Sequence, residues 1–320
     1  MLRYITKRIA LIVPTLLLIL SVLFFLLHLM PGDPVTILAG EYEPPPELRA
    51  SIEATYGLDK PLYVQYILFI GEALKFNLGR SIIYGKPVID VILERIPATS
   101  LLLVAAIFWS SIFGVLFPLA TIKFHGKKVE GLFNVLAVGG YSIPIFWLGQ
   151  ILVLVFSYWL NFFPSYGITS VGQMAGFELA KDIAQHLFLP AITLGAVEFS
   201  ILARTGRIRL LEELSESYVI TARSKGLPFR TILLRHVFRN VLTTIVTMIG
   251  HRLAYIISLS MIVEVVFAWP GLGSLLVTSI FRRDYSTILG VFYFYTLIVI
   301  IASIITDLLY SKIDPRVKMR

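Results

Sequence analysis

The chain has 320 residues, of which 57% are hydrophobic and only 15% are charged. Because a soluble protein is usually about a quarter charged, this composition excludes an ordinary soluble fold and predicts an integral membrane protein. The net charge of +8 does not indicate a nucleic-acid partner, because the basic residues lie between long apolar runs, where they set membrane topology. The absence of cysteine excludes disulfides, thiolate metal sites and a cysteine nucleophile.

The apolar runs predict an all-α protein with about six transmembrane helices, since crossing the bilayer core takes roughly 20 apolar residues. The runs are too long and too uniformly apolar for the strands of a barrel. The fourth run is the shortest and contains Glu198. In chain order the predicted spans are Ile9–Met30, Ala98–Ile122, Leu132–Leu160, Leu187–Ala203, Val241–Val263 and Thr287–Tyr310.

The distribution of basic residues predicts that both termini are cytoplasmic. Lysine and arginine gather at the two termini and in the connections after the second and fourth spans, and the positive-inside rule places such segments in the cytoplasm. An even number of spans agrees with this orientation. The residues are Arg3, Lys7, Arg8, Lys123, Lys127, Lys128, Arg204, Arg207, Arg209, Arg223, Lys225, Arg230, Arg235, Arg239, Lys312, Arg316, Lys318 and Arg320.

This topology predicts a single transmembrane domain over residues 1–320. The first span ends at residue 30 and is retained, because it is longer than the apolar core of a signal peptide, about 7–15 residues. An extracytoplasmic insertion follows, and then a core of five helices with a large cytoplasmic loop and a short tail. The insertion covers residues 31–97 and holds an amphipathic stretch at Tyr63–Phe76. The core covers residues 98–310, with its cytoplasmic loop at 204–240, and the tail covers residues 311–320.

Several kinds of chemistry are missing from the sequence. No phosphate-binding loop of the Gly-x-x-x-x-Gly-Lys-Ser/Thr type is present, so we expect that the chain does not hydrolyse ATP itself. The five histidines show no paired metal-ligand spacing. We therefore expect a protein that is not an enzyme and that binds neither a metal nor another cofactor.

The large cytoplasmic loop contains residues that typically begin and end a short helix. Ser217 is a favoured N-cap residue for a helix over Tyr218–Lys225, and Gly226 suits the left-handed position after its last turn. Pro228 suits the first position of a second helix, which we expect to run to about Asn240.

Because a helix of two turns is not stable alone in water, another surface must hold it. The small side chains of Thr221 and Ala222, with Gly226, would allow close approach by another protein, and Arg223 and Lys225 would meet an acidic partner or lipid headgroups. The alternative interpretation is a solvated basic loop that only enforces topology.

The same loop carries a family resemblance. Tyr218–Leu227, followed by Leu234–Asn240, resembles the "EAA" loop of binding-protein-dependent ABC importers, in the variant of the B-type subunit of dipeptide, oligopeptide and nickel permeases. The chain departs from the pattern in lacking a late proline where Arg239-Asn240 stands, and at Phe76-Asn77 and His251-Arg252. Further matching segments follow in order: Pro31–Pro34, Gly57–Pro61, Gln65-Tyr66, Leu78–Ser81, Glu94–Thr99, Glu264–Gly273, Arg283–Tyr285 and Asp314–Arg316.

The resemblance implies the permease of a type I ABC importer in the inner (plasma) membrane. Its implied partners are a homologous second permease, which would make a heterodimer, two cytoplasmic ATPases that use ATP and Mg, and an external solute-binding protein. The short helix, from Ser217 and Tyr218 to Gly226, would seat in a cleft on an ATPase and transmit its motion. Peptides are the implied cargo, with oligosaccharides and nickel as alternatives. A stand-alone channel or an ion-coupled carrier is the alternative of a different class.

Polar residues within the predicted spans are candidates for the translocation pathway. Glu198 and Arg252 are unfavourable in lipid, so they should face the bundle interior or water, either separately or as a pair; the alternative is a structural ion pair near a helix end. Gln150 and Asn161 are further candidates, and Pro144 should kink the third span. The segment Trp269, Pro270 and Gly271 is expected to form a tight turn, either at an outer gate or as an interfacial aromatic anchor.

Overall fold

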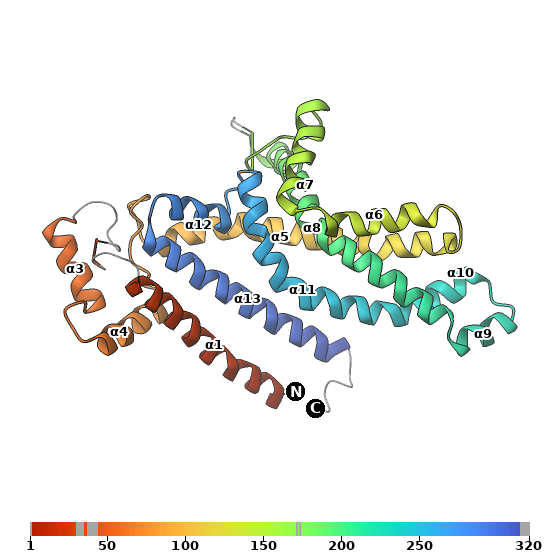
Figure 1. Ribbon diagram of the computed structural model, residues 1–320, viewed down its shortest axis with the longest axis horizontal. Helices are drawn as coiled ribbons and strands as arrows, with labels where there is room; N and C mark the ends of the chain where they lie inside the picture. The colour runs from red at the N-terminus through yellow and green to blue at the C-terminus, as the bar shows by residue number, and fades with distance from the viewer. Residues whose placement is uncertain (1, 30–34, 37–43, 171, 173, 314–320) are drawn as a thin grey trace. The chain divides into compact units, whose positions relative to one another are not determined.

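A computed structural model describes residues 2–29, 35–36, 44–170, 172 and 174–313, and these residues form helices joined by turns (Figure 1). The long helices are α1 (Leu2–Leu29), α5 (Val88–Thr121), α8 (Gly176–Leu214), α11 (Phe238–Val266) and α13 (Tyr285–Ile313). The shorter ones are α3 (Pro46–Tyr56), α4 (Leu62–Leu74), α6 (Glu130–Ser142), α7 (Ile145–Leu152), α9 (Ser217–Ser224), α10 (Phe229–Thr231) and α12 (Leu272–Phe281). Short segments of other helix types are the 3₁₀ turn η1 (Ile122–Phe124) and the π-helical segments η2 (Val153–Trp159) and η3 (Ile232–Val237).

Within the described residues, four helical segments are long and apolar enough to cross a membrane, or five if a bent pair of helices counts as one span. The four are Val88–Phe124, Gly176–Leu214, Phe229–Gly250 and Tyr285–Thr306. The predicted first span falls on α1, where the described apolar stretch, Val13–Leu26, is shorter. An all-helical membrane protein is thus supported, whereas six spans and cytoplasmic termini stay predictions.

The helices extend beyond the apolar runs that predict them. The second predicted span begins at Ala98, but α5 begins ten residues earlier, at Val88, and the fourth predicted span occupies only the middle of α8. An apolar run marks the part of a helix that fits the hydrocarbon core, whereas the helix itself continues wherever its backbone hydrogen bonds can. The amphipathic stretch in the insertion is confirmed as α4, and α3 begins at Pro46, at the first helical position that favours proline.

The third predicted span is broken rather than merely kinked. α6 ends at Ser142 and α7 begins at Ile145, and the axes of the two segments differ by 110°. Ile143 is extended, with φ −96° and ψ 130°. The cause is Pro144, which lacks an N–H donor and forces the residue before it out of the helical region.

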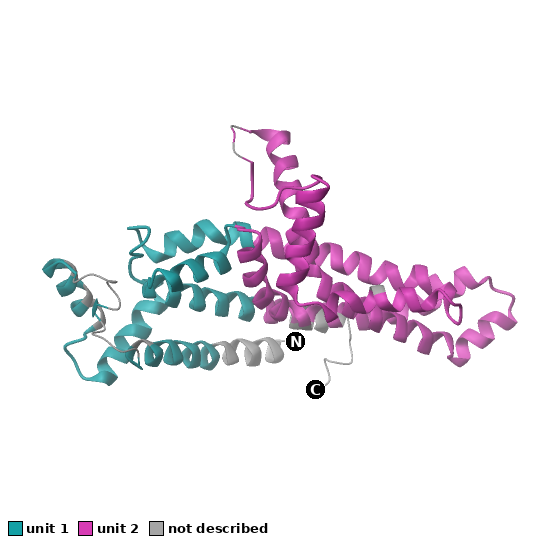
Figure 2. Cartoon of the chain, turned by 45° about the horizontal axis from the view of Figure 1, so that its top comes forward, with its two compact units in different colours: residues 1–99, 270–301 teal, residues 100–269, 302–320 magenta. Residues whose placement is uncertain are grey.

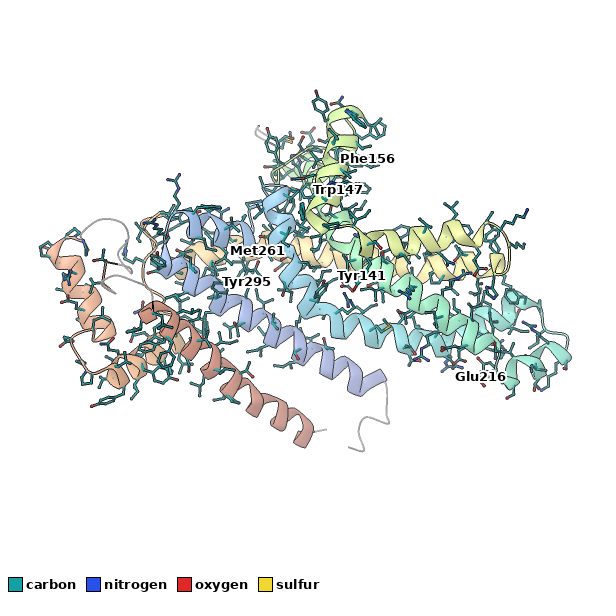
Figure 3. All side chains as sticks on the ribbon, in the orientation of Figure 1. Tyr141, Trp147, Phe156, Glu216, Met261 and Tyr295 are labelled. Carbon is teal, nitrogen blue, oxygen red and sulfur yellow. The ribbon has the colours of Figure 1, made fainter. Side chains whose placement is uncertain are left out.

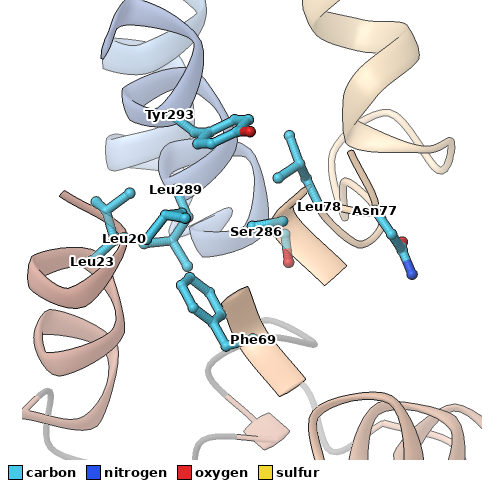
Figure 4. Close-up of a pocket in the computed structure, with 9 residues that line it drawn as sticks. Leu20, Leu23, Phe69, Asn77, Leu78, Ser286, Leu289 and Tyr293 are labelled. Carbon is cyan, nitrogen blue, oxygen red and sulfur yellow. The ribbon is translucent and has the colours of Figure 1, made fainter. Parts of the chain in front are cut away.

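The chain divides into two compact units, which are described separately (Figure 2). Unit 1 comprises residues 1–99 and 270–301. In it the ring of Phe24 on α1 packs against Tyr66 and Phe69 of α4, at centroid distances of 5.4 and 5.6 Å. Phe69 also lines a hollow, together with leucines and Tyr293 (Figure 4).

Unit 2 comprises residues 100–269 and 302–320, and α8 packs against both α6 and α11 in it. Glycines permit the closest helix contacts. A Cβ atom on Gly140 of α6 would lie 2.5 Å from the carbonyl oxygen of Ala196 on α8, and a Cβ on Gly195 would lie 2.6 Å from Nε1 of Trp109. Small residues at helix contacts are typical of membrane bundles, where close backbone approach supplies the packing energy.

Candidate functional site

The α9 helix is held by a buried apolar cluster, which we call the α9 core. Val219 and Ala222 of α9 are 0% and 8% exposed, and they pack with buried side chains of α8, η3 and α11. The α9 core consists of Ile122, Leu202, Leu210, Val219, Ala222, Ile232, Leu233, Val237, Val241 and Ile245. This packing supplies the support that an isolated helix of two turns lacks, so α9 is a fixed element and not a solvated loop.

The ends of α9 differ by one residue from the sequence prediction. Glu216 is the N-cap and makes no side-chain capping bond, so the prediction of Ser217 as N-cap is wrong, and Ser217 is the first helical residue. Gly226 is left-handed, with φ +76°, as predicted. Pro228 precedes α10 instead of opening it, and the second helix does not end near Asn240 but continues through η3 into α11.

A polar contact ties α9 to its neighbours at its first turn. The Tyr218 hydroxyl donates to Oε2 of Glu213, on α8, at 2.6 Å, and Nδ2 of Asn240, on α11, donates to the same oxygen at 3.1 Å. Burial, followed by the nearby Glu213 carboxylate, raises the pKa of Tyr218 to about 12. Tyr218 therefore faces inward and stays a neutral donor at physiological pH.

The outward face of α9 is mixed apolar and basic. Ile220 is 62% exposed, and Thr221, Arg223, Lys225 and Gly226 are also exposed. Ala222, in contrast, is buried in the α9 core, so the expectation that it faces a partner is wrong. Helical periodicity is the reason, because Val219 and Ala222 are three residues apart and share one face. A partner would meet Ile220, Thr221 and the basic side chains.

A second polar cluster, which the sequence analysis missed, lies at the N-terminal end of α6. Arg207 of α8 donates from Nη2 to Oε1 of Glu130 at 2.5 Å, and Glu130 also accepts from His125 and from the backbone N–H of Gly126. Nη1 of Arg207 lies 3.4 Å from the hydroxyl of Thr121. We call this the Arg207–Glu130 pair. The sequence signal that could have indicated this pair is Glu130, an acidic residue that follows the basic connection between α5 and α6.

The predicted intramembrane residues Glu198 and Arg252 form an ion pair. Nε of Arg252, on α11, donates to Oε2 of Glu198, on α8, at 2.6 Å. The guanidinium also lies over the ring of Tyr255, 4.8 Å from its centroid. The Glu198 side chain is 7% exposed and that of Arg252 is 26% exposed. We call this the Glu198–Arg252 pair; the pairing is confirmed, and its place on a pathway stays a prediction.

One oxygen of Glu198 is left over beside a small hollow. Oε1 is buried and has no hydrogen-bond partner among the described residues. The residues that line the hollow are two serines, the two members of the ion pair and five aliphatic residues. Its lining is Ile107, Ser110, Ser111, Glu198, Leu202, Ile249, Arg252, Leu253 and Ile256.

The remaining predicted site residues lie elsewhere. Gln150 is exposed on α7, the helix that also carries the labelled Trp147, and it does not line the hollow (Figure 3). Asn161 is exposed after η2 with φ +52°. Trp269 is 0% exposed, so its alternative interpretation as an interfacial aromatic anchor is wrong, and Gly271 is the N-cap of α12. Among the described residues no group of three or more His, Asp or Glu side chains could hold a metal ion.

Comparison with known proteins identifies the class of membrane protein. The model of the family "binding-protein-dependent transport system inner membrane component" matches residues 110–319, and the model of the N-terminal membrane component of the same systems matches residues 1–103. The glutathione transport system permease protein GsiC of Salmonella paratyphi A is 35% identical over 320 residues, 100% of both chains. The di/tripeptide transport system permease protein DppB of Pseudomonas aeruginosa is 34% identical over 333 residues, 99% of both chains.

The matches cover both units and run from end to end of the chain, so the resemblance of the α9 region is part of a whole-length similarity. The chain belongs to the inner-membrane permease family of binding-protein-dependent ABC transport systems and is a multi-pass membrane protein.

Proposed function

We propose that this chain is the subunit through which an ATP-driven importer moves small peptides across the cell membrane. The two relatives are permeases for glutathione and for di- and tripeptides. Glutathione is itself a short peptide, so both names indicate one class of cargo. The alternatives left open by the sequence, oligosaccharides and nickel, gain no support from these names.

We further propose the assembly and topology that the sequence predicts. The partners are a second, homologous permease, two cytoplasmic ATPases that use ATP and Mg, and an external solute-binding protein that delivers the cargo. Six spans in one domain, with both termini in the cytoplasm, result if α1 and the bent pair α6–α7 each count as a span. The chain itself is then a non-catalytic subunit, and alternating access moves the cargo.

The observation that carries the proposal is the way α9 is mounted. Its inner face is anchored in the α9 core and by Tyr218, whereas its outer face, with Ile220 and Arg223, is exposed. The core joins α9 to α8 and α11, which both contain stretches long and apolar enough to cross a membrane. A force on α9 would therefore move these helices as rigid bodies, which is how closure of an ATPase could change access to the pathway.

The test is a pull-down of the chain from its native membranes, followed by reconstitution of the complex. We expect an ATPase to be recovered with the chain, and ATP hydrolysis to be stimulated by binding protein loaded with peptide but not with sugar or nickel. Recovery of the chain without any ATPase would contradict the importer assembly. Stimulation by sugar or nickel alone would leave the assembly intact and overturn the peptide cargo.

The variant Ile220→Glu tests the coupling surface. In the docked complex the glutamate would be buried against the ATPase and would disrupt an apolar contact. We therefore expect association with the ATPase to weaken by at least about tenfold. The melting temperature of the chain should stay unchanged, because Ile220 is exposed. Lys128→Glu introduces the same side chain at an exposed site of the α5–α6 connection and should retain the ATPase. Equal retention by both variants would exclude the outer face of α9 as the docking surface.

A further inference from the structure

We propose that the hollow beside Glu198 is a transient site for a primary ammonium group of the cargo, the α-ammonium that peptides carry. This inference rests on the proposed peptide cargo. Its basis is the unused oxygen of the Glu198–Arg252 pair, because Oε2 of Glu198 is occupied by Arg252 while Oε1 is buried at the wall of the hollow without a partner among the described residues. A buried carboxylate oxygen without a hydrogen bond is unfavourable, so a donor is expected there.

The hollow has the size and the acceptors for an ammonium group. Such a group is about as large as a water molecule, and the hollow has room for about one occupant of that size. An ammonium donates three hydrogen bonds and accepts none. Oε1 of Glu198 can take one, and Ser110 and Ser111, whose hydroxyl groups can accept hydrogen bonds, also line the hollow. The Ser110 hydroxyl already donates to Ile107, which leaves its lone pairs to accept.

Other occupants fit less well. A calcium ion needs about 6–8 oxygen ligands and magnesium needs near-octahedral coordination, whereas most of the wall of the hollow is aliphatic. An anion would meet the unused carboxylate oxygen. A resident water molecule would satisfy Oε1, and it is the occupant that an incoming ammonium group would displace.

The geometry also supplies a route of entry and a reason for the arginine. Arg252 is 26% exposed, so the pair lies at the open rim of the hollow and not in a closed core. Arg252 holds one oxygen of Glu198 in place, and the other oxygen then has a fixed direction. Because every unmodified linear peptide has the same α-ammonium, such a contact suits a permease that passes peptides of different sequence.

The experiment measures uptake into proteoliposomes that contain the whole importer, with a peptide that its binding protein delivers. We expect Glu198→Gln to lower uptake by about tenfold or more, the factor of a lost charge-assisted hydrogen bond. The melting temperature and the ATPase stimulation by loaded binding protein should be retained. Glu212→Gln is the matched control, because Glu212 is also on α8 and also accepts from an arginine, Arg209, at 2.9 Å.

A charge swap separates cargo contact from structure. The double variant Glu198→Arg with Arg252→Glu restores an ion pair, but it presents a guanidinium to the hollow, and that group repels ammonium. We expect its melting temperature to match that of the wild type while uptake stays low. Wild-type uptake by the double variant, or by Glu198→Gln, would show that the hollow holds only water. If the swap does not fold, Glu198→Gln decides alone, and a wild-type complex that takes up no peptide would instead overturn the proposed function.

Discussion

Two of the arginine–carboxylate pairs in unit 2 differ in how completely they are bonded. In the Arg207–Glu130 pair, both carboxylate oxygens have donors, from Arg207, His125 and the backbone of Gly126. In the Glu198–Arg252 pair, one carboxylate oxygen is bonded and the other faces a hollow. The first arrangement closes a contact between helices, and the second leaves a binding capacity unused.

The difference indicates which part of unit 2 is held rigidly and which part could accept a ligand. The Arg207–Glu130 pair joins α8 to the start of α6, and the Tyr218 contact joins the C-terminal end of α8 to α9 and α11. Together with the α9 core they make the base of unit 2 a rigid support. A fully bonded polar network rigidifies the fold, whereas a buried polar group without a partner is energetically costly. We therefore expect mutations in the two pairs to have different effects.

The largest effect on stability is expected from Glu130→Ala. It leaves the Arg207 guanidinium, whose side chain is only 9% exposed, without its carboxylate. Removing one partner of a buried ion pair is strongly destabilising, because the other charge is left uncompensated. We expect the melting temperature of the purified chain to fall by several degrees.

The matched comparison is Glu198→Ala. Here Arg252 is more exposed and lies over Tyr255, so part of its environment remains. The melting temperature should fall less than for Glu130→Ala, whereas peptide uptake should fall more. Equal effects of both variants on both measurements would remove the distinction between the two pairs.

The sequence predicted one of these pairs and missed the other, and the cause is the background of each residue. Glu198 and Arg252 are charged residues within apolar runs, where any charge requires a partner. Glu130 and Arg207 lie among other charged residues, where an arginine is expected for topology alone. Only the folded structure shows that the side chain of Arg207 points inward, to Glu130 and Thr121.

Helices were predictable in kind but not in extent. The apolar runs located α5, α8, α11 and α13, because the length of a run reflects the thickness of the bilayer. Their ends were not predictable, since polar residues at the membrane surface continue a helix without a change of pattern. The position of α9 was predictable from Gly226, but the inward face of Ala222 became visible only with the α9 core.

The next largest effect is expected at the contact of α6 with α8, and two neighbouring glycines test it. A methyl group on Gly140 would lie 2.5 Å from the carbonyl oxygen of Ala196 and 2.6 Å from the hydroxyl of Ser200. Overpacking of this kind costs about 1–3 kcal/mol, so Gly140→Ala should lower the free energy of unfolding. On Gly139 the same methyl group meets nothing within 4 Å. Gly139→Ala should therefore be neutral or slightly stabilising, and a loss at both positions would contradict the contact.

The smallest effect on stability is expected from Tyr218→Phe, which removes only a hydroxyl. The lost bond to Glu213 should lower the melting temperature slightly and reduce ATPase stimulation, because α9 is then held by its apolar face alone. The folded pKa of Tyr218, about 12, lies above the ordinary tyrosine value. The hydroxyl thus stabilises the fold fully below that ordinary value of about 10, and its contribution is lost as the pH rises from there through the folded pKa.

The difference in melting temperature between the wild type and Tyr218→Phe should accordingly be constant from about pH 6 to about pH 9, where tyrosine stays protonated. Tyr141→Phe removes the same hydroxyl from an exposed tyrosine on α6, away from α9, and provides the control for the ATPase measurement. If α9 transmits motion only through the α9 core, Tyr218→Phe will match the wild type in the stimulated rate of ATP hydrolysis. Reduced stimulation at unchanged affinity for the ATPase would instead show that the Tyr218 contact with α8 and α11 transmits part of the motion.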